Sequence, residues 1–261
     1  MKQASYFFVV LILMFSGFSC SESSENPENK LTQEKQMSRS QQLIHQAIEA
    51  HGGDLYKEAH YSFVFRGNRF SFKNSSHNGT IYTRVLHKGD SVWVDSLMND
   101  KLRRTINGKQ IELSPKEMNT ASESINSVIY FATLPHKLAD EAVVSRWVES
   151  TPILGKTYQA IEVTFRKEGG GQDFEDRFMY WIEEETSRVD YLAYSYKVNG
   201  GGVRFRKAYN SRIVGGILFQ DYINFKAPLG TELNQLPRLL ETEKLTEISR
   251  IETEEVMQIQ E

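Results

Sequence analysis

The chain has 261 residues, of which 25% are charged and 39% hydrophobic, and its formal net charge is −3 at pH 7. This balance excludes an extended phosphate-binding surface, which needs a clustered excess of basic residues. The nearest basic clusters alternate with apolar residues, which predicts the solvent face of a strand and indicates no nucleic-acid partner; they are Lys101, Arg103 and Arg104, and Arg204, Arg206 and Lys207. One cysteine cannot form an internal disulfide.

Residues 1–19 have the features of an export signal. Lys2 precedes an almost uninterrupted apolar run from Tyr6 to Phe18, and small residues follow at the end of that run. As a helix, this run of about thirteen residues rises about 20 Å, which is short of the roughly 30 Å of hydrocarbon in a bilayer. We therefore predict a cleaved signal peptide and not a membrane span.

Cys20 follows the apolar run directly, with Ser19 before it and a polar stretch after it. This arrangement resembles a bacterial lipobox, especially the relaxed ones of Bacteroidetes-type bacteria, although Gly17 and Phe18 depart from the usual Leu and small residue. The resemblance implies an acylated cysteine that carries palmitate-type chains and anchors the protein in a membrane. Ser21 lacks the aspartate that retains many lipoproteins in the inner membrane, so the outer membrane is expected, on either its periplasmic or its surface face. An unmodified thiol beside an ordinary cleavage site is the alternative.

Residues 20–37 contain mostly Ser, Glu, Asn, Gln and Lys, a composition typical of a flexible tether. A single domain is predicted for 38–253, followed by a polar tail at 254–261. The domain begins with a helix that Ser38 or Ser40 caps and that Gly52-Gly53 ends, because Leu43, Ile44, Ala47 and Ile48 share one face.

After this helix the apolar period changes from 3.6 to 2, which is typical of strands separated by Gly and Asn turns. The predicted strands are 58–66, 69–73, 79–87, 91–97, 101–106, 157–166, 177–183, 188–197, 203–211 and 216–226. A second helix is predicted from Ser114-Pro115 to about Thr133. Residues 236–251 fit either a helix or an edge strand.

These elements predict a mainly β (α+β) fold: a large curved antiparallel sheet, or half-barrel, with the N-terminal and mid-chain helices packed on its concave face. His51-Gly52-Gly53, the meander and Gly155-Lys156-Thr157-Tyr158 resemble the LolA/LolB-like half-barrel lipoproteins. The stretch Arg206 to Phe225 resembles an uncharacterised family of Bacteroidetes lipoproteins, which implies no activity.

No catalytic residue, metal ligand set or cofactor is predicted. The six histidines are scattered, the nucleophile motif Gly-x-Ser-x-Gly is absent, and the glycine run Gly169–Gly171 lacks the Lys-Ser/Thr of a phosphate loop. Acidic residues around 173–176 and 183–185 flank a strand and are interpreted as solvated hairpin ends. Asp221 is the one carboxylate within an otherwise apolar strand.

The resemblance to LolA/LolB-like proteins implies that the concave face holds a lipid or another apolar small molecule. Phe219 and Asp221 are expected on one strand face because they are two residues apart. The predicted ligand-binding residues are Phe219, Asp221, Phe63, Phe65, Phe178 and Tyr180, and the anchor is Cys20. An envelope module that acts through contacts with unidentified proteins, and an enzyme without a recognisable motif, remain as alternatives.

Overall fold

The computed structural model describes residues 37–77, 79–99, 101–167, 176–197 and 200–260. These residues belong to one compact unit, Met37–Glu261. The predicted signal peptide, Cys20 and most of the predicted tether lie outside the described residues.

The first helix, α1 (Arg39–Ala50), begins at the predicted cap. The Ser38 hydroxyl accepts a hydrogen bond from the Gln41 backbone amide, and the Gln41 side chain accepts one from the Ser38 amide. The helix ends at His51, and Gly52 takes a φ of 127°, which a residue with a Cβ adopts only with strain. A short 3-10 helix, η2 (Gly53–Glu58), then leads into the first strand.

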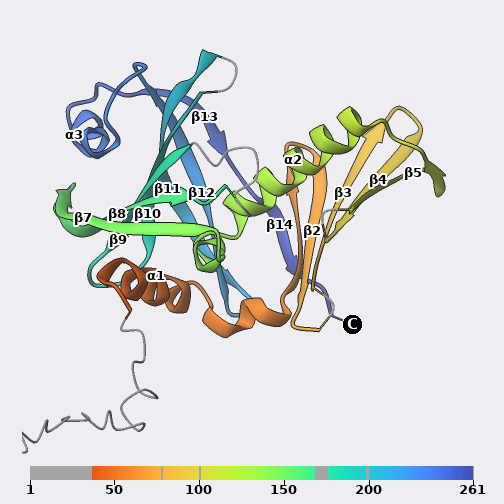
Figure 1. The fold of residues 1–261 in the computed structure, drawn as a ribbon, viewed down its shortest axis with the longest axis horizontal. Coiled ribbons are helices and arrows are strands. Elements are labelled where there is room, and N and C mark those ends of the chain that lie inside the picture. The colour runs from red at the N-terminus through yellow and green to blue at the C-terminus, as the bar shows by residue number, and fades with distance from the viewer. Residues whose placement is uncertain (1–36, 78, 100, 168–175, 198–199, 261) are drawn as a thin grey trace, which may run out of the picture. The chain divides into compact units, whose positions relative to one another are not determined.

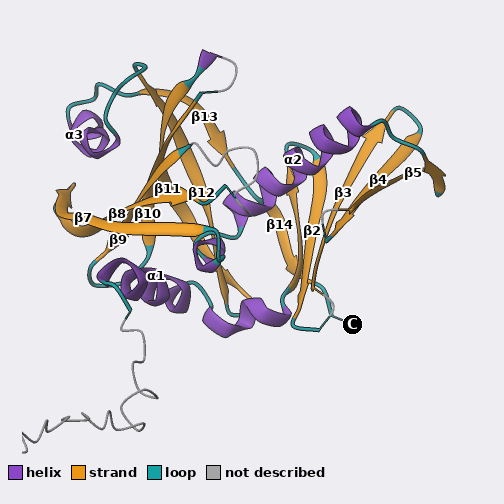
Figure 2. Cartoon of the chain, in the orientation of Figure 1, coloured by secondary structure: helices purple, strands orange, loops and turns teal. Residues whose placement is uncertain are grey.

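Seven antiparallel strands form the first sheet (Figure 2). Six follow one another along the chain as a meander: β1 (His60–Phe65), β2 (Asn68–Ser75), β3 (Gly79–Lys88), β4 (Ser91–Met98), β5 (Lys101–Ile106) and β6 (Lys109–Ile111). The seventh, β14 (Glu254–Gln258), pairs with β1 at the opposite edge. One edge strand of the first sheet therefore comes from the C-terminal end of the described chain.

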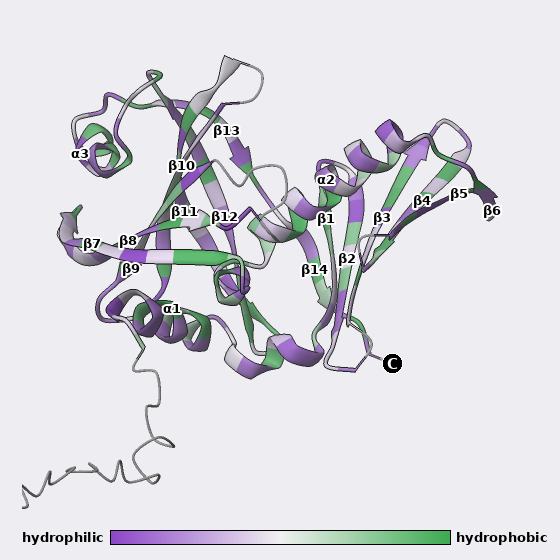
Figure 3. Ribbon diagram, in the orientation of Figure 1, coloured by the Kyte–Doolittle hydropathy of each residue, from purple (hydrophilic) through white to green (hydrophobic). Residues whose placement is uncertain are grey.

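Helix α2 (Pro115–Ala132) connects the two sheets in sequence and covers the first one (Figure 1). Ser114 caps it with a capping box, and Pro115 occupies the first turn. The helix carries both hydrophobic and hydrophilic residues (Figure 3), and its apolar side, with Ile125 and Ile129, joins a core that also contains Phe63 and Phe72 from the sheet.

The second sheet also has seven antiparallel strands. These are β7 (Val143–Ile153), β8 (Lys156–Phe165), β9 (Arg177–Glu183), β10 (Val189–Tyr196), β11 (Gly202–Val214), β12 (Ile217–Ala227) and β13 (Thr246–Ile251). One face packs on α1, on η3 (His136–Ala139) and on the end of α2. The other face packs on η5 (Leu233–Gln235) and α3 (Leu236–Glu241), so central strands such as β9 are buried on both sides.

The mainly β fold, the antiparallel pairing and the two predicted helices are confirmed. The strands form two sheets where one large sheet was expected, because the insertion of α2 interrupts the ladder between β6 and β7. The predicted domain ended at 253, whereas the structure continues it through β14, whose backbone pairs with β1. Both interpretations of 236–251 hold in part, since this stretch contains α3 and then β13.

Candidate ligand-binding clefts

A cleft of about 470 Å³ lies between the two sheets beside α2, and we call it the inter-sheet cleft. The first sheet contributes Phe65, Phe70 and Arg84, and α2 contributes Val128 and Phe131. The second sheet contributes a mixed set of side chains, namely Tyr194, Arg206, Gln220, Tyr222, Asn224 and Ile251. Apolar and polar groups therefore line one cleft that is open on one side.

The antiparallel register of β11 and β12 explains why Arg206 and Asn224 lie together, because they are direct cross-strand partners. Arg206 is 7% exposed. Its Nη2 donates to the Tyr194 hydroxyl over 3.0 Å, and its Cζ lies 3.8 Å from the centroid of the Phe131 ring. Arg206 was expected on a solvent face, and this expectation is wrong because α2 covers this side of β11.

Several buried polar atoms around this arginine lack a partner. Within the described part of the chain, no hydrogen-bond partner is found for Nε and Nη1 of Arg206, for Oε1 of Gln220 or for Oδ1 of Asn224. Gln220 uses its Nε2 to donate to the Val189 carbonyl and to the Tyr222 hydroxyl. Buried polar groups are normally paired in folded proteins, so this cluster is a candidate binding site.

The charge that lines the cleft is positive. Arg66, Arg84 and Arg206 line it, and no Asp or Glu is among its described lining residues. Arg84 pairs with the buried Asp95 over 2.5 Å, and Arg104 pairs with the same carboxylate over 2.6 Å. Burial alone would raise the pKa of Asp95, but the hydrogen bonds from Arg104 and Arg84 outweigh it and lower this pKa.

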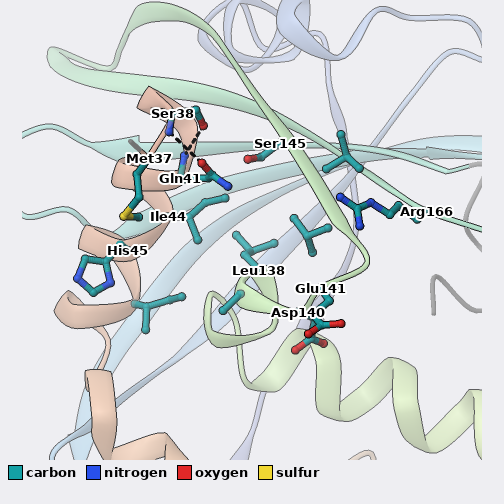
Figure 4. Close-up of a pocket in the computed structure, with 14 residues that line it drawn as sticks. Met37, Ser38, Gln41, Ile44, His45, Leu138, Asp140, Glu141, Ser145 and Arg166 are labelled. Atoms are coloured by element: carbon teal, nitrogen blue, oxygen red, sulfur yellow. Dashed lines mark hydrogen bonds between the residues drawn. The ribbon is translucent and has the colours of Figure 1, made fainter. Parts of the chain in front are cut away.

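A second cleft, of about 480 Å³, lies between α1, η3 and β7 (Figure 4). Ile44 and Leu138 give it apolar walls, while Asp140, Glu141 and Arg166 give it charges of both signs. None of its described lining residues carries a buried polar side-chain atom that lacks a partner. It offers a ligand less specific chemistry than the inter-sheet cleft does.

Among the predicted ligand-binding residues, Phe65 lines the inter-sheet cleft. Phe63 and Phe219 belong to the core under α2, where they are 0% and 1% exposed. The Phe219 ring lies 5.4 Å from that of Tyr61, measured between centroids. The structure therefore places these two phenylalanines behind the cleft wall.

Phe178 and Tyr180 lie in the core between the second sheet and the helices. The Tyr180 hydroxyl is hydrogen-bonded to that of Tyr130 over 2.7 Å, and the Phe178 ring contacts Tyr194, which lines the cleft. Asp221 is buried and accepts hydrogen bonds from Arg212 and Thr253. Its role in ligand binding stays a prediction.

Sequence reasoning missed Arg206, Phe131 and Asn224, which the structure brings together. Alternation along β11 gives Arg206 the pattern of an exposed strand residue, and nothing local indicates that a helix covers it. Among the described residues, no group of three or more His, Cys, Asp or Glu side chains is arranged to hold a metal. None of the described helices has the length and apolar character needed to cross a bilayer.

A family model described as "Family of unknown function (DUF6503)" matches residues 10–253. No curated protein matches the chain. Among solved structures, the chain is similar to a LolA superfamily protein from Nitrosomonas europaea, with 10% identity and a TM-score of 0.43; the match covers 86% of this chain and 95% of that one. A DUF1329 family protein from Desulfovibrio piger has 10% identity and a TM-score of 0.39, covering 85% and 94%.

A third similar structure is the lipoprotein LppX from Mycobacterium tuberculosis, with 12% identity and a TM-score of 0.26, covering 61% of this chain and 88% of that one. At identities and TM-scores this low, nothing about ligand or activity carries over to this chain.

Proposed function

The chain belongs to the DUF6503 family of unknown function, and we propose that it binds a lipid or another apolar small molecule in the inter-sheet cleft. The observation that carries the proposal is the cleft itself. Its volume of about 470 Å³ falls within the range of small-molecule sites, and its walls combine aromatic and aliphatic side chains with a few polar groups. A core filled by its own side chains would leave no such space.

The proposal extends to the place where binding occurs. In this proposal, the protein is exported, acylated at Cys20 and held at the outer membrane. The polar segment 20–37 links the folded unit to the acylated cysteine. What supports this is the apolar run that ends at Cys20 and the polar stretch that follows it. A domain tethered beside a bilayer has a lipid source within reach.

A fluorescent fatty acid tests the cleft directly. A soluble form starting at Ser21 contains the whole folded unit, so the probe is titrated into this form and into two variants. Ser127 is an exposed α2 residue that lines the cleft, so Ser127→Trp fills the cleft without removing a core contact. Asn126→Trp is the matched control, because Asn126 is exposed on the same helix but is not among the lining residues.

We expect saturable probe binding by the wild type and by Asn126→Trp, and at least about tenfold weaker binding by Ser127→Trp. If the wild type binds no probe, the ligand-binding proposal fails and a module that acts through protein contacts becomes the better reading. Equal binding by both variants would place the ligand outside this cleft.

A further inference from the structure

The guanidinium of Arg206 is buried with two of its three nitrogen atoms unpartnered among the described residues. Nη2 donates to the Tyr194 hydroxyl, and Cζ lies over the Phe131 ring in a cation–π contact. The ring supplies no oxygen or nitrogen acceptor, so this contact leaves Nε and Nη1 without one among the described residues. The structure thus presents donors at the cleft wall that nothing described in the chain satisfies.

Among the described residues, the nearby carboxylates and phenols do not supply the missing negative charge. The Asp221 carboxylate accepts from Arg212 and from Thr253, and the Asp95 carboxylate accepts from Arg84 and Arg104. Burial raises the pKa of Tyr222 to about 12 and that of Tyr180 well above its usual value, so both phenols stay neutral at physiological pH.

An unpaired charge buried in this way is costly, since a buried donor without an acceptor loses its hydration and gains nothing in return. An anion is the partner that offsets this cost, and a hydrogen bond to a charged group is the strong kind. Beside the arginine, the cleft continues along Phe65, Phe70 and Val128, which offer apolar contact. The site therefore combines a cationic end with an apolar wall.

We propose that Arg206 binds the negatively charged head group of a single-chain amphiphile, a carboxylate or a phosphate, while the alkyl chain lies against Phe65, Phe70 and Val128. This inference rests on the proposed function and names the class of ligand. Gln220 Oε1 and Asn224 Oδ1 are acceptors beside the head group, and they accept hydrogen bonds from any hydroxyl that it carries.

The first test varies the head group and needs no mutation. The soluble form starting at Ser21 is titrated by calorimetry with palmitic acid, hexadecyl phosphate, hexadecanol and hexadecylamine, which share one chain. We expect at least one of the two anions to bind about tenfold or more tightly than hexadecanol, and hexadecylamine to bind most weakly. The stronger of the two anions identifies the head group.

The second test replaces Arg206 by Met, with Arg204→Met as the control. Arg204 lies on the same strand, bonds to Tyr196 and is not among the lining residues of the cleft. We expect Arg206→Met to bind the anion that the wild type prefers no more tightly than hexadecanol. We also expect it to melt at the same temperature as the wild type or higher, because it removes a buried charge without an ion-pair partner. Arg204→Met keeps the preference for the anion.

The outcomes separate the two proposals. If the wild type binds neither palmitic acid nor hexadecyl phosphate more tightly than hexadecanol, the role of Arg206 is overturned and the apolar-ligand function stands. If none of the four compounds binds, the proposed function fails as well. If Arg206→Met does not fold, Arg206 has a structural role, and the head-group comparison on the wild type still decides whether the site prefers an anion.

Discussion

The Asp221 carboxylate accepts a hydrogen bond from the Thr253 backbone amide, with 2.9 Å between Oδ1 and the nitrogen. Thr253 lies between β13 and β14, which belong to different sheets. Asp221 also accepts hydrogen bonds from the Thr253 hydroxyl, from Asn210 and from Arg212. This buried carboxylate therefore fixes the segment by which the chain passes from the second sheet to the first.

Replacement of Asp221 by Ala is expected to lower the free energy of unfolding by about 3 kcal/mol or more, because it leaves buried donors and the Arg212 cation without their acceptor. Urea denaturation measures the change. Glu252→Ala is the control, since Glu252 is an exposed neighbour that bonds to Tyr209. Equal losses in the two variants would contradict a special role for Asp221.

A buried histidine predicts how stability depends on pH. His51 is 0% exposed, and its Nε2 accepts a hydrogen bond from the Val189 backbone amide over 3.2 Å. Burial, and then the charge of Arg188, lower the pKa of His51 to about 3, whereas an unfolded histidine titrates near 6.5. Between these values the unfolded chain holds a proton that the folded chain lacks, so folding becomes less favourable as pH falls.

This histidine is expected to reduce the free energy of unfolding by about 2 kcal/mol between pH 7 and pH 5. His136 acts in the same direction, because burial and then the charge of Lys137 lower its pKa to about 4. It is expected to reduce the free energy of unfolding by a similar amount over the same pH range. Urea denaturation at both pH values is compared for the wild type and His51→Gln, whose amide oxygen can still accept from Val189. Between pH 7 and pH 5, the free energy of unfolding of His51→Gln should fall by about 2 kcal/mol less than that of the wild type. An unchanged pH dependence would mean that His51 is not held neutral.

Phe219 and Phe65 were both predicted to bind the ligand, but their replacement by Gln is expected to affect stability and binding differently. Phe219 packs in the core against Tyr61, so Phe219→Gln should cost about 3 kcal/mol or more through lost packing and an unpaired amide. Phe65 is half-buried at the cleft, so Phe65→Gln should cost less than about 1.5 kcal/mol and weaken binding of the fluorescent fatty acid. Unchanged probe affinity in Phe65→Gln would remove Phe65 from the site.

Much of the fold follows from local sequence signals. Ser38 and Ser114 cap their helices as predicted, and turns such as Asn107-Gly108 separate strands close to the expected ranges. These features depend on hydrogen bonds and backbone angles within a few residues, and local sequence determines them directly.

The division into two sheets and the chemistry of the cleft depend on contacts between distant parts of the chain. β14 pairs with β1 although nearly the whole domain separates them in sequence. The sequence of β14 is polar, so on its own it predicts a tail outside the domain. Arg206 alternates like a solvent-facing residue, and only the position of Phe131 on α2 makes it buried. The alternation of polar and apolar residues along one strand does not show which of its residues a distant helix covers.

The proposed membrane anchor is tested by replacing Cys20 with Ala. A diacylated or triacylated cysteine stays in a bilayer because each buried methylene contributes about 0.8 kcal/mol. The wild type should therefore fractionate with the membrane and incorporate labelled palmitate, and Cys20→Ala should do neither. A variant that stays membrane-bound, with no palmitate label in the wild type, would contradict the lipoprotein proposal.

The central claim is that the inter-sheet cleft holds a lipid-like molecule. Native mass spectrometry of the soluble form starting at Ser21, purified without detergent and then incubated with palmitic acid, measures this most directly. We predict a one-to-one adduct for the wild type and for Asn126→Trp, and the bare protein mass for Ser127→Trp. The bare protein mass for all three, at micromolar protein and ligand, would contradict the claim.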